Sequence, residues 1–502
     1  KPMTQNVETN NNQRFSSRLG LILSALGIAV GTGNIWRFPR IAAQSGGEDG
    51  AGAFLFAWLI FLFVWSIPLI IAEYTLGRKF RLGTIGVFKK AIGEKFAWMG
   101  TFVAFVSTAI AFFYTVVVGW CIYYFYITLF HPLPVDSVEA MGVWDRFQDS
   151  NWPLLFHFLA VGFGALVVWR GVRTIEKVNK ILIPTLLFIV LLSLIRAITL
   201  PGAFEGIKYL FTPDWEQLEK PKIWLAALTQ NAWDTGAGWG LFLTYAVYMQ
   251  SKFGVVKNAF ITGIGNNIVS IIAAIMVFGT VFSVLQNDMG MSSSETLEIM
   301  KSSGPASTGL TFIWMPQLFA KMPMGSVLAV LFFLGLTFAG FSSIIAMFEL
   351  PTRVLLDMGL SRSKAVSIVV AVVYLFGIPS AKNLNFLSNQ DYVWGIALMI
   401  SGAFIAAAII KLGAKRMTEE LGTIQNDWRV GKWWIVEMKY IVPVAAFILL
   451  FWWLFQSATV FAPEAWYNPL NPFSVMTCLV QWFVVLAIFI LFNRRIASKV
   501  KG

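Results

Sequence analysis

Long apolar runs constrain this chain more than any other feature of its sequence. Runs of about 18 or more mostly apolar residues recur along the chain, and each is long enough to cross the hydrocarbon core of a bilayer as a helix. Only 13% of the 502 residues are charged, whereas soluble domains carry about 25%. The pattern therefore predicts an all-α polytopic membrane protein. Twelve spans are predicted, near residues 19–44, 52–77, 96–130, 153–169, 181–200, 223–250, 258–286, 324–356, 366–380, 391–411, 433–460 and 470–493.

Basic residues fall in every second connection between these spans, and they indicate the orientation. Arginine and lysine gather at 78–95, 170–180 and 494–501, whereas the connection 131–151 holds four acidic residues against Arg146. Because positively charged loops stay in the cytoplasm, we expect both termini on the cytoplasmic side of a plasma (inner) membrane. The same distribution assigns the net charge of +12 to topology rather than to nucleic-acid binding, and the expected partner is the lipid bilayer. The oligomeric state stays open between a monomer and a weak dimer.

Glycines interrupt the first and the sixth predicted spans. The stretches are GIAVGTGN at 27–34 and DTGAGWG at 234–240, and each glycine in a helix interior costs roughly 1 kcal/mol relative to alanine. The interrupted spans begin two successive blocks of five, and an odd-numbered block reverses direction in the membrane. Paired broken helices of inverted repeats indicate a binding site near the midplane, where unwound carbonyls face cations and half-helix N–H groups face anions.

The domain organisation follows from these two blocks of five spans. A polar, cytosolic N-terminal tail is expected at 1–13 and is not a secretory signal, because it lacks an apolar core. The first inverted repeat is expected at 14–200 and the second at 201–412. The last two spans and the cytosolic C-terminus then occupy 413–502. The connection 286–323 is expected to form short helices.

The sequence lacks the residue patterns that are typical of enzymes, ATP-driven pumps and ion channels. Two cysteines and two histidines lie apart in the sequence and form no metal-binding, disulfide or catalytic pattern, so an enzyme is not expected. The sequence contains no GxxxxGK[ST] phosphate loop and no TVGYG-like filter, which argues against an ATP-driven pump and an ion channel.

Five motifs, in this order, carry a resemblance to a known family. They are RLGLILSALGIAVGTGNIWRFP at 18–39, GGEDGAGAFLFAWLIFLFVWSIPLIIAEYTLGR at 46–78, LTYAVYM at 243–249, FAGFSSIIAM at 338–347 and DYVWG at 391–395. The set resembles the neurotransmitter:sodium symporter family, over nearly the whole chain. The resemblance implies a leucine-transporter-like fold of twelve transmembrane helices with a five-plus-five inverted repeat. It also implies sodium-coupled symport of a neutral amino acid by alternating access, with another zwitterion, such as a betaine or an omega-amino acid, as the alternative.

The resemblance implies two sodium sites built from neutral oxygens. Such ligands suit sodium, because unwound backbone and small polar side chains supply hard oxygens without a large fixed charge. The first site falls on the Ala29 carbonyl with Asn34, Asp234 and Asn266, and the second on the carbonyls of Gly27, Val30 and Ala339 with the hydroxyls of Ser342 and Ser343.

The implied substrate site lies between the two breaks. The N–H groups of residues 31–33 and the Tyr114 hydroxyl are expected to hold a carboxylate. Gly31 supports this, because amine-transporting members of the family carry an aspartate there, whereas amino-acid carriers keep glycine. The full set of expected substrate-binding residues is Ala29, Gly31, Thr32, Gly33, Ile110, Tyr114, Trp233, Asp234, Gly236, Trp239, Ser343 and Met347.

The resemblance also places two gates. Arg37 and Asp391 match the pair that closes the outer side, with Trp233 as the aromatic lid. Asp357 matches the acid of the inner gate. The position of its arginine partner is Asn12 in this chain, which leaves Arg14 as the alternative.

Asp234 departs from the family pattern. Many members carry Ser or Thr there and bind chloride nearby, at positions that correspond to Trp58, Gln230, Asp234, Asn266 and Ser270 of this chain. A carboxylate in the site can offset the charge of the sodium ions in a low-dielectric setting. We therefore expect that Asp234 compensates this charge, that chloride is not required, and that Asp234 exchanges a proton when sodium leaves. A protonated or hydrogen-bonded side chain without this role is the alternative.

Overall fold

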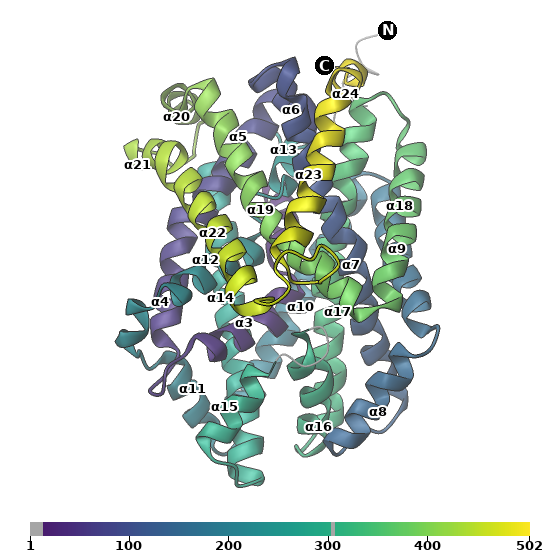
Figure 1. Ribbon diagram of the computed structural model, residues 1–502, viewed down its shortest axis with the longest axis vertical. Coiled ribbons are helices and arrows are strands. Elements are labelled where there is room, and N and C mark those ends of the chain that lie inside the picture. The colour runs from purple at the N-terminus through teal and green to yellow at the C-terminus, as the bar shows by residue number, and fades with distance from the viewer. Residues whose placement is uncertain (1–13, 303–306, 502) are drawn as a thin grey trace.

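The computed structural model describes residues 14–302 and 307–501, and the regular secondary structure in these ranges is helical (Figure 1). Within them, nine helices are long and apolar enough to cross a membrane on their own. Two further spans are bent helix pairs, and a third broken pair completes the twelve predicted spans. The prediction of a polytopic all-α fold is confirmed. The expected tail at 1–13 lies outside the described residues.

The spans keep the order that the apolar runs predicted. Their bounds are α2 and α3 (Arg18–Ala29, Thr32–Ser45), α4, η1 and α5 (Gly52–Phe61, Leu62–Ser66, Ile67–Phe80), η2 and α7 (Glu94–Phe96, Ala97–Phe130), α9 (Trp152–Trp169), α10 (Val172–Ile198), α12 and α13 (Pro221–Thr235, Leu241–Val247), α14 and η4 (Val256–Phe282, Ser283–Asp288), α17 (Gly325–Asp357), α18 (Arg362–Lys382), α19 (Leu384–Leu412), α21, η7, α22 and η8 (Lys432–Val436, Glu437–Ile441, Val442–Gln456, Ser457–Phe461) and α23 (Val475–Leu491).

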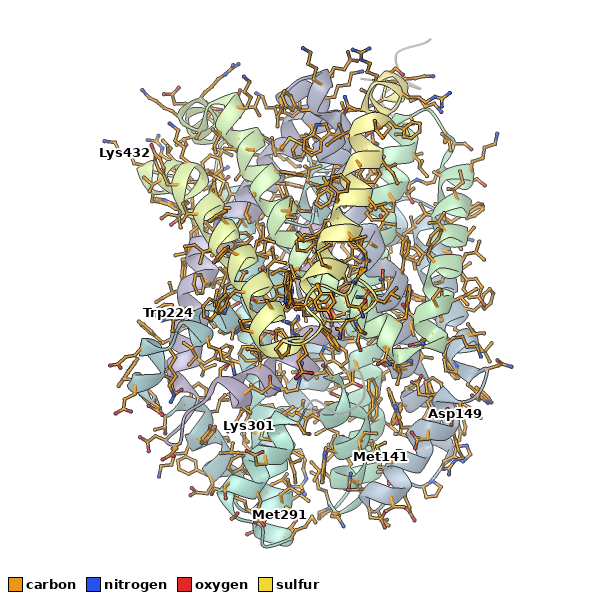
Figure 2. The ribbon with its side chains drawn as sticks, in the orientation of Figure 1. Met141, Asp149, Trp224, Met291, Lys301 and Lys432 are labelled. Atoms are coloured by element: carbon orange, nitrogen blue, oxygen red, sulfur yellow. The ribbon has the colours of Figure 1, made fainter. Side chains whose placement is uncertain are left out.

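Short helices cover the two ends of this bundle. Figure 1 shows α6, α20 and α24 at the top and α8, α11, α15 and α16 at the bottom, and in Figure 2 Lys432 lies toward the first end while Asp149 and Met291 lie toward the second. The basic connections and the acidic connection 131–151 are therefore at opposite ends. The bounds are α6 (Thr84–Ala91), α20 (Ala414–Gly422), α24 (Asn493–Lys499), α8 (Ser137–Gln148), α11 (Ala203–Phe211), η3 (Trp215–Glu219), α15 (Ser293–Lys301), η6 (Leu310–Trp314) and α16 (Met315–Ala320).

Both predicted helix breaks are present. The first separates α2 from α3, which meet at a bend of 46°, and Gly31 there has an extended backbone. The second separates α12 from α13, and Gly236, Gly238 and Gly240 all have positive φ angles of 70°, 86° and 80°. Glycine adopts this left-handed conformation without steric cost, which explains why three of them stand in five residues.

The start of α10 differs from its prediction. The apolar run indicated a span from residue 181, whereas the helix begins at Val172. Arg173, Glu176 and Lys177 lower the hydropathy of this turn without opposing helix formation, because these residues have good helix propensity. Glu176 is held by the hydroxyls of Ser16 and Ser17 at 2.6 and 3.0 Å, in front of α2.

A π-helical turn, η1, lies inside the second span. Such a wide turn inserts an extra residue into a helix and leaves backbone groups free for other partners. Next to η1, the Trp58 carbonyl accepts a hydrogen bond of 3.0 Å from the Asn231 side chain, and Ser66 accepts one of 2.9 Å from Thr235. The turn therefore ties the second span to α12, directly before the second break.

Candidate functional site

The two breaks face each other across a small cavity of about 30 Å³. Helix α7 contributes Tyr114, and α17 contributes Ser343 and Met347. The cavity is lined by all of the predicted substrate-binding residues except Thr32 and Ile110. Ile28, Asn34 and Leu241 also line it and were not among the predicted substrate contacts. Ile110 is fully buried on α7, four residues before Tyr114.

A polar group of atoms surrounds Gly31 at the beginning of α3. A Cβ atom on Gly31 would lie 3.0 Å from the Ser343 hydroxyl oxygen and 3.1 Å from the Tyr114 hydroxyl oxygen. The backbone N–H and the hydroxyl of Thr32 lie within hydrogen-bonding distance of Tyr114, at 3.3 and 3.2 Å. N–H groups at a helix N-terminus attract anions, so this corner of the cavity fits a carboxylate.

Aromatic rings form the opposite wall. The indole rings of Trp233 and Trp239 meet edge to face, with centroids 5.4 Å apart. Trp239 is fixed through its backbone, because its carbonyl accepts a hydrogen bond of 2.5 Å from Ser107 on α7. A wall of this kind, with Met347 and Leu241 beside it, suits an uncharged side chain.

The residues of the first predicted sodium site converge. The side-chain oxygen of Asn266 lies 3.0 Å from the Ala29 carbonyl oxygen and 3.2 Å from the Asp234 carbonyl oxygen. Asn34 is 2.7 Å from the same atom through its amide nitrogen, and its oxygen accepts a hydrogen bond of 2.9 Å from Gly31. The Ala29 and Asp234 carbonyl oxygens thus converge on the amide end of Asn266, beside Asn34. Carbonyl and amide oxygens are hard, neutral ligands of the kind that sodium prefers. The donor set therefore fits sodium.

The residues of the second predicted sodium site also meet. The Ser343 hydroxyl oxygen lies 3.4 Å from the Gly27 carbonyl oxygen on α2 and 3.3 Å from the Ala339 carbonyl oxygen on α17. Ser342 donates a hydrogen bond of 2.9 Å to Ala339. Val30 follows directly after α2, in a conformation that is neither helical nor extended. The set combines carbonyls at the end of α2 and on α17 with two hydroxyls of α17.

The Asp234 carboxylate is buried beside the first of these groups. One oxygen accepts a hydrogen bond of 2.6 Å from Gln230, and the other lies 3.5 Å from the Ser270 hydroxyl. Ser270 in turn accepts a hydrogen bond of 2.8 Å from Asn34. Within the described residues, the indole N–H of Trp58 and the side-chain oxygen of Gln230 are buried without a hydrogen-bond partner.

Arg37 and Asp391, the residues predicted to close the outer side, both lie near Trp233. The Arg37 guanidinium lies over the Trp233 ring, 5.1 Å from its centroid. Asp391 approaches the same region one turn before Gly395, whose Cβ position would be 3.0 Å from the Trp233 ring and 3.7 Å from the Asp391 carboxylate. In the described part of the chain, Arg37 and Asp391 do not form an ion pair within 4.0 Å. The Trp233 indole therefore lies near both charged residues.

The inner acid, Asp357, has a partner that the sequence interpretation did not name. Its carboxylate accepts hydrogen bonds of 2.5 Å from Arg353, one turn earlier on α17, and of 2.6 Å from the Gly83 N–H. Asn12 lies outside the described residues. Arg14 and Asp357 form no ion pair among the described residues, so the local Arg353 takes the place that the sequence left to Arg14.

Two buried carboxylates were missed by the sequence interpretation. Glu73 on α5 accepts N–H groups of Gly238 and Leu243, at 2.6 and 3.1 Å, from the second break. Glu349 on α17 forms a two-pronged ion pair with Arg362, with both distances at 2.8 Å, and also accepts a hydrogen bond from Tyr248 after α13. A lone acid in an apolar run is itself a signal of function, and both of these stand in such runs.

Comparisons with known proteins identify the family of this chain. The family model described as "Sodium:neurotransmitter symporter family" matches residues 12–150 and 143–499. A sodium-dependent transporter of Methanocaldococcus jannaschii is 32% identical over 455 residues, covering 87% of this chain and 89% of the relative. The sodium-dependent neutral amino acid transporter B(0)AT3 of Mus musculus is 27% identical over 522 residues, covering 86% and 83%.

A solved structure shares the fold. The crystal structure of MhsT in complex with L-phenylalanine superimposes with a TM-score of 0.75 at 29% identity, and the match covers 88% of this chain and 99% of that one. Family match, relatives and architecture therefore point the same way. The chain belongs to the sodium:neurotransmitter symporter family, a family of sodium-coupled transporters rather than enzymes, and has the leucine-transporter-like fold.

Proposed function

We propose that this protein is a symporter that couples the entry of sodium to the uptake of a neutral α-amino acid. The observation that carries the proposal is the corner around Gly31, where a helix N-terminus and the hydroxyls of Tyr114 and Ser343 meet beside an apolar wall. A zwitterion with its own carboxylate fills such a corner without a buried charge left unpaired. The names of two similar proteins, which refer to neutral amino acids and to L-phenylalanine, support the same class.

Two sodium sites are part of the proposal. The oxygens of Ala29, Asp234 and Asn266 form the first, together with Asn34, and the second combines the carbonyls of Gly27, Val30 and Ala339 with Ser342 and Ser343. Both sites include backbone from the first break, which also holds Gly31. Sodium would therefore order the same unwound segment that binds the substrate, which is a physical basis for coupled binding.

The location is proposed on the charge pattern, and the repeat organisation on the two broken helices. Connections rich in lysine and arginine gather at the end of the bundle with α6, α20 and α24, which we assign to the cytoplasmic side of the plasma membrane, together with both termini. The inverted repeats are assigned to 14–200 and 201–412. Closure at the outer side is assigned to Arg37, Trp233 and Asp391, and closure at the inner side to Asp357.

Uptake into proteoliposomes tests the function directly. Each of the twenty amino acids, glycine betaine and γ-aminobutyrate would be measured with an inward sodium gradient and with potassium in its place. We expect saturable uptake of one or more neutral α-amino acids in sodium only. Uptake that is equal in potassium would contradict sodium coupling, and a preference for betaine or γ-aminobutyrate would contradict the substrate class.

A further inference from the structure

A second cavity, of about 260 Å³, lies at the end of the bundle that carries α6, α20 and α24, far along the second span from the substrate site. Its walls come from the end of α5, from the turn after α13 and from α20. Figure 1 shows α5 beside α20 at the top of the molecule. The polar and charged groups in its lining are Thr75, Arg78, Lys79, Arg81, Ser251 and Glu420.

Positive charge exceeds negative charge in this cavity. Lys79 is neutralised, because its ammonium nitrogen contacts both carboxylate oxygens of Glu420 at 2.5 and 2.7 Å. Arg78 and Arg81 take part in none of the ion pairs found among the described residues. Neither guanidinium group therefore has an ion-pair partner of its own, and the negative charges that act on Arg78 are those of Glu420 and of Asp427 outside the lining.

The two arginines differ in how their donors are used. Arg81 donates to the carbonyls of Ala246, Val247 and Met249 at the end of α13, so its guanidinium caps that helix. Arg78 donates once, at 2.5 Å to the Ser251 carbonyl, and its Nε atom is buried without a partner among the described residues. Arg78 therefore makes fewer hydrogen bonds than its guanidinium group allows.

The arginines also oppose each other. Burial, together with the neighbouring charges of Arg14 and Arg78, lowers the pKa of Arg81 to about 10. An anion in the cavity would reduce this repulsion and satisfy the buried Arg78 donor. Guanidinium groups match the geometry of phosphate oxygens, which they bind through paired hydrogen bonds.

We propose that this cavity binds a phosphate-type oxyanion through Arg78, either as a free ion or as the phosphate of an anionic lipid headgroup. Arg78 stands two residues before the end of the second span. Basic residues at the cytoplasmic ends of spans are attracted to anionic lipid headgroups. A bound phosphate would fix the end of α13 through the neighbouring Arg81. Because α13 is one half of the broken sixth span, the anion would stabilise one position of a segment that contributes Leu241 to the substrate cavity.

Thermal unfolding of the purified full-length protein tests the proposal. Detergent samples would be titrated with inorganic phosphate against chloride at equal ionic strength, and nanodisc samples would compare phosphatidylglycerol with phosphatidylcholine. The variants are R78Q, which removes the donor, R78K, which keeps the charge, and K90Q, which removes an exposed charge of α6 outside the cavity.

We expect a higher melting temperature of the wild type and of K90Q with phosphate, with phosphatidylglycerol, or with both. The half-saturating phosphate concentration of R78Q should be about tenfold higher, and R78K should be intermediate, since a charged hydrogen-bond donor is lost or displaced. A response to phosphate alone identifies a free ion, and a response to the lipid alone identifies a headgroup. No response in the wild type to either probe, or equal responses of R78Q and K90Q, would overturn the proposal.

Discussion

The Glu73 carboxylate accepts a hydrogen bond of 2.6 Å from the Gly238 N–H, 165 residues away in the sequence. The same carboxylate accepts the Leu243 N–H at 3.1 Å, in the first turn of α13. Glu73 on α5 thus accepts N–H groups that have no carbonyl partner because the helix is interrupted at the second break. One N–H donor of the break and one of the first helical turn are thereby satisfied inside the protein, where water is scarce.

We expect Glu73→Gln to loosen the second break. The amide would turn its own N–H group toward one of the two N–H donors, and a buried donor left without an acceptor costs about 1–3 kcal/mol. The melting temperature of the purified protein should fall, and sodium-dependent uptake should fall with it. Glu298→Gln, on an exposed face of α15, is the matched control and should change neither quantity. Normal uptake and stability in Glu73→Gln would show that the break does not depend on this carboxylate.

Gly31→Asp is expected to abolish amino-acid binding. The new carboxylate would begin at a Cβ position 3.0 Å from the Ser343 oxygen and 3.1 Å from the Tyr114 oxygen, where the substrate carboxylate is proposed to lie. A buried charge without a partner costs several kcal/mol. Gly31→Ala adds a Cβ atom without a charge, so it measures the steric effect alone and should weaken binding less. Substrate titrations by scintillation proximity would measure both, and unchanged affinity of Gly31→Asp would place the substrate elsewhere.

The double variant Ser342→Ala/Ser343→Ala is expected to lose sodium-dependent substrate binding while it remains folded. It removes two oxygens from the group around Gly27 and Ala339 and leaves the helix backbone unchanged. Thr337→Val on the same helix removes a hydroxyl that only returns to its own backbone, and it should bind as the wild type does. Equal sodium dependence in all three proteins would argue against the second sodium site.

Asp234→Ser is expected to convert the transporter from chloride independence to chloride dependence, or to inactivate it. The wild-type carboxylate, bonded to Gln230 and near Ser270, is proposed to offset the charge of the sodium ions. Uptake would be compared in chloride and in gluconate for both proteins. A wild type that already requires chloride would contradict this assignment, as would an Asp234→Ser variant that ignores it.

The Glu349–Arg362 pair is expected to be strongly coupled. Glu349 is fully buried, so Arg362→Gln leaves a charge without its partner, at a cost of about 3–5 kcal/mol. Glu349→Gln/Arg362→Gln should recover part of this loss, and a double-mutant cycle from chemical unfolding measures the coupling. Arg416→Gln, on an exposed face of α20, provides the control. Additive effects of the two substitutions would show that the pair does not act as a unit.

Hydropathy and glycine placement predicted the spans and both breaks because each reflects a local property of the chain. The length of an apolar run indicates whether a helix can cross the bilayer. The clustered glycines at 236–240 indicate a backbone in the left-handed conformation. The start of α10 was predicted nine residues late, since helix formation does not require apolar residues. Arg353 stands four residues before Asp357, a spacing that favours an ion pair on one helix face, but the family motif identified the acid and directed the search for its partner to the N-terminus.

The contacts of Glu73 and Glu349 were beyond the sequence for a different reason. Each acid is conspicuous in its apolar run, but its partners lie on other helices and are brought near only by packing. The candidate sodium groups were reached through the family motifs instead. Nothing in the spacing of Asn34 and Asn266, 232 residues apart, predicts that their side chains lie within 2.7 Å of each other.

The π-helical turn η1 sets the phase of the second span. A regular helix turns about 100° per residue, so one inserted residue rotates everything that follows by roughly that angle. Glu73 stands seven residues after Ser66, the last residue of η1, and therefore faces the second break only with the insertion in place. Deletion of one residue from Leu62–Ser66 would keep the span apolar and long enough for the bilayer, yet it would turn Glu73 toward a different neighbour. A change of one residue in the length of this span should therefore still allow it to cross the membrane, but it should disrupt the contact between Glu73 and the second break.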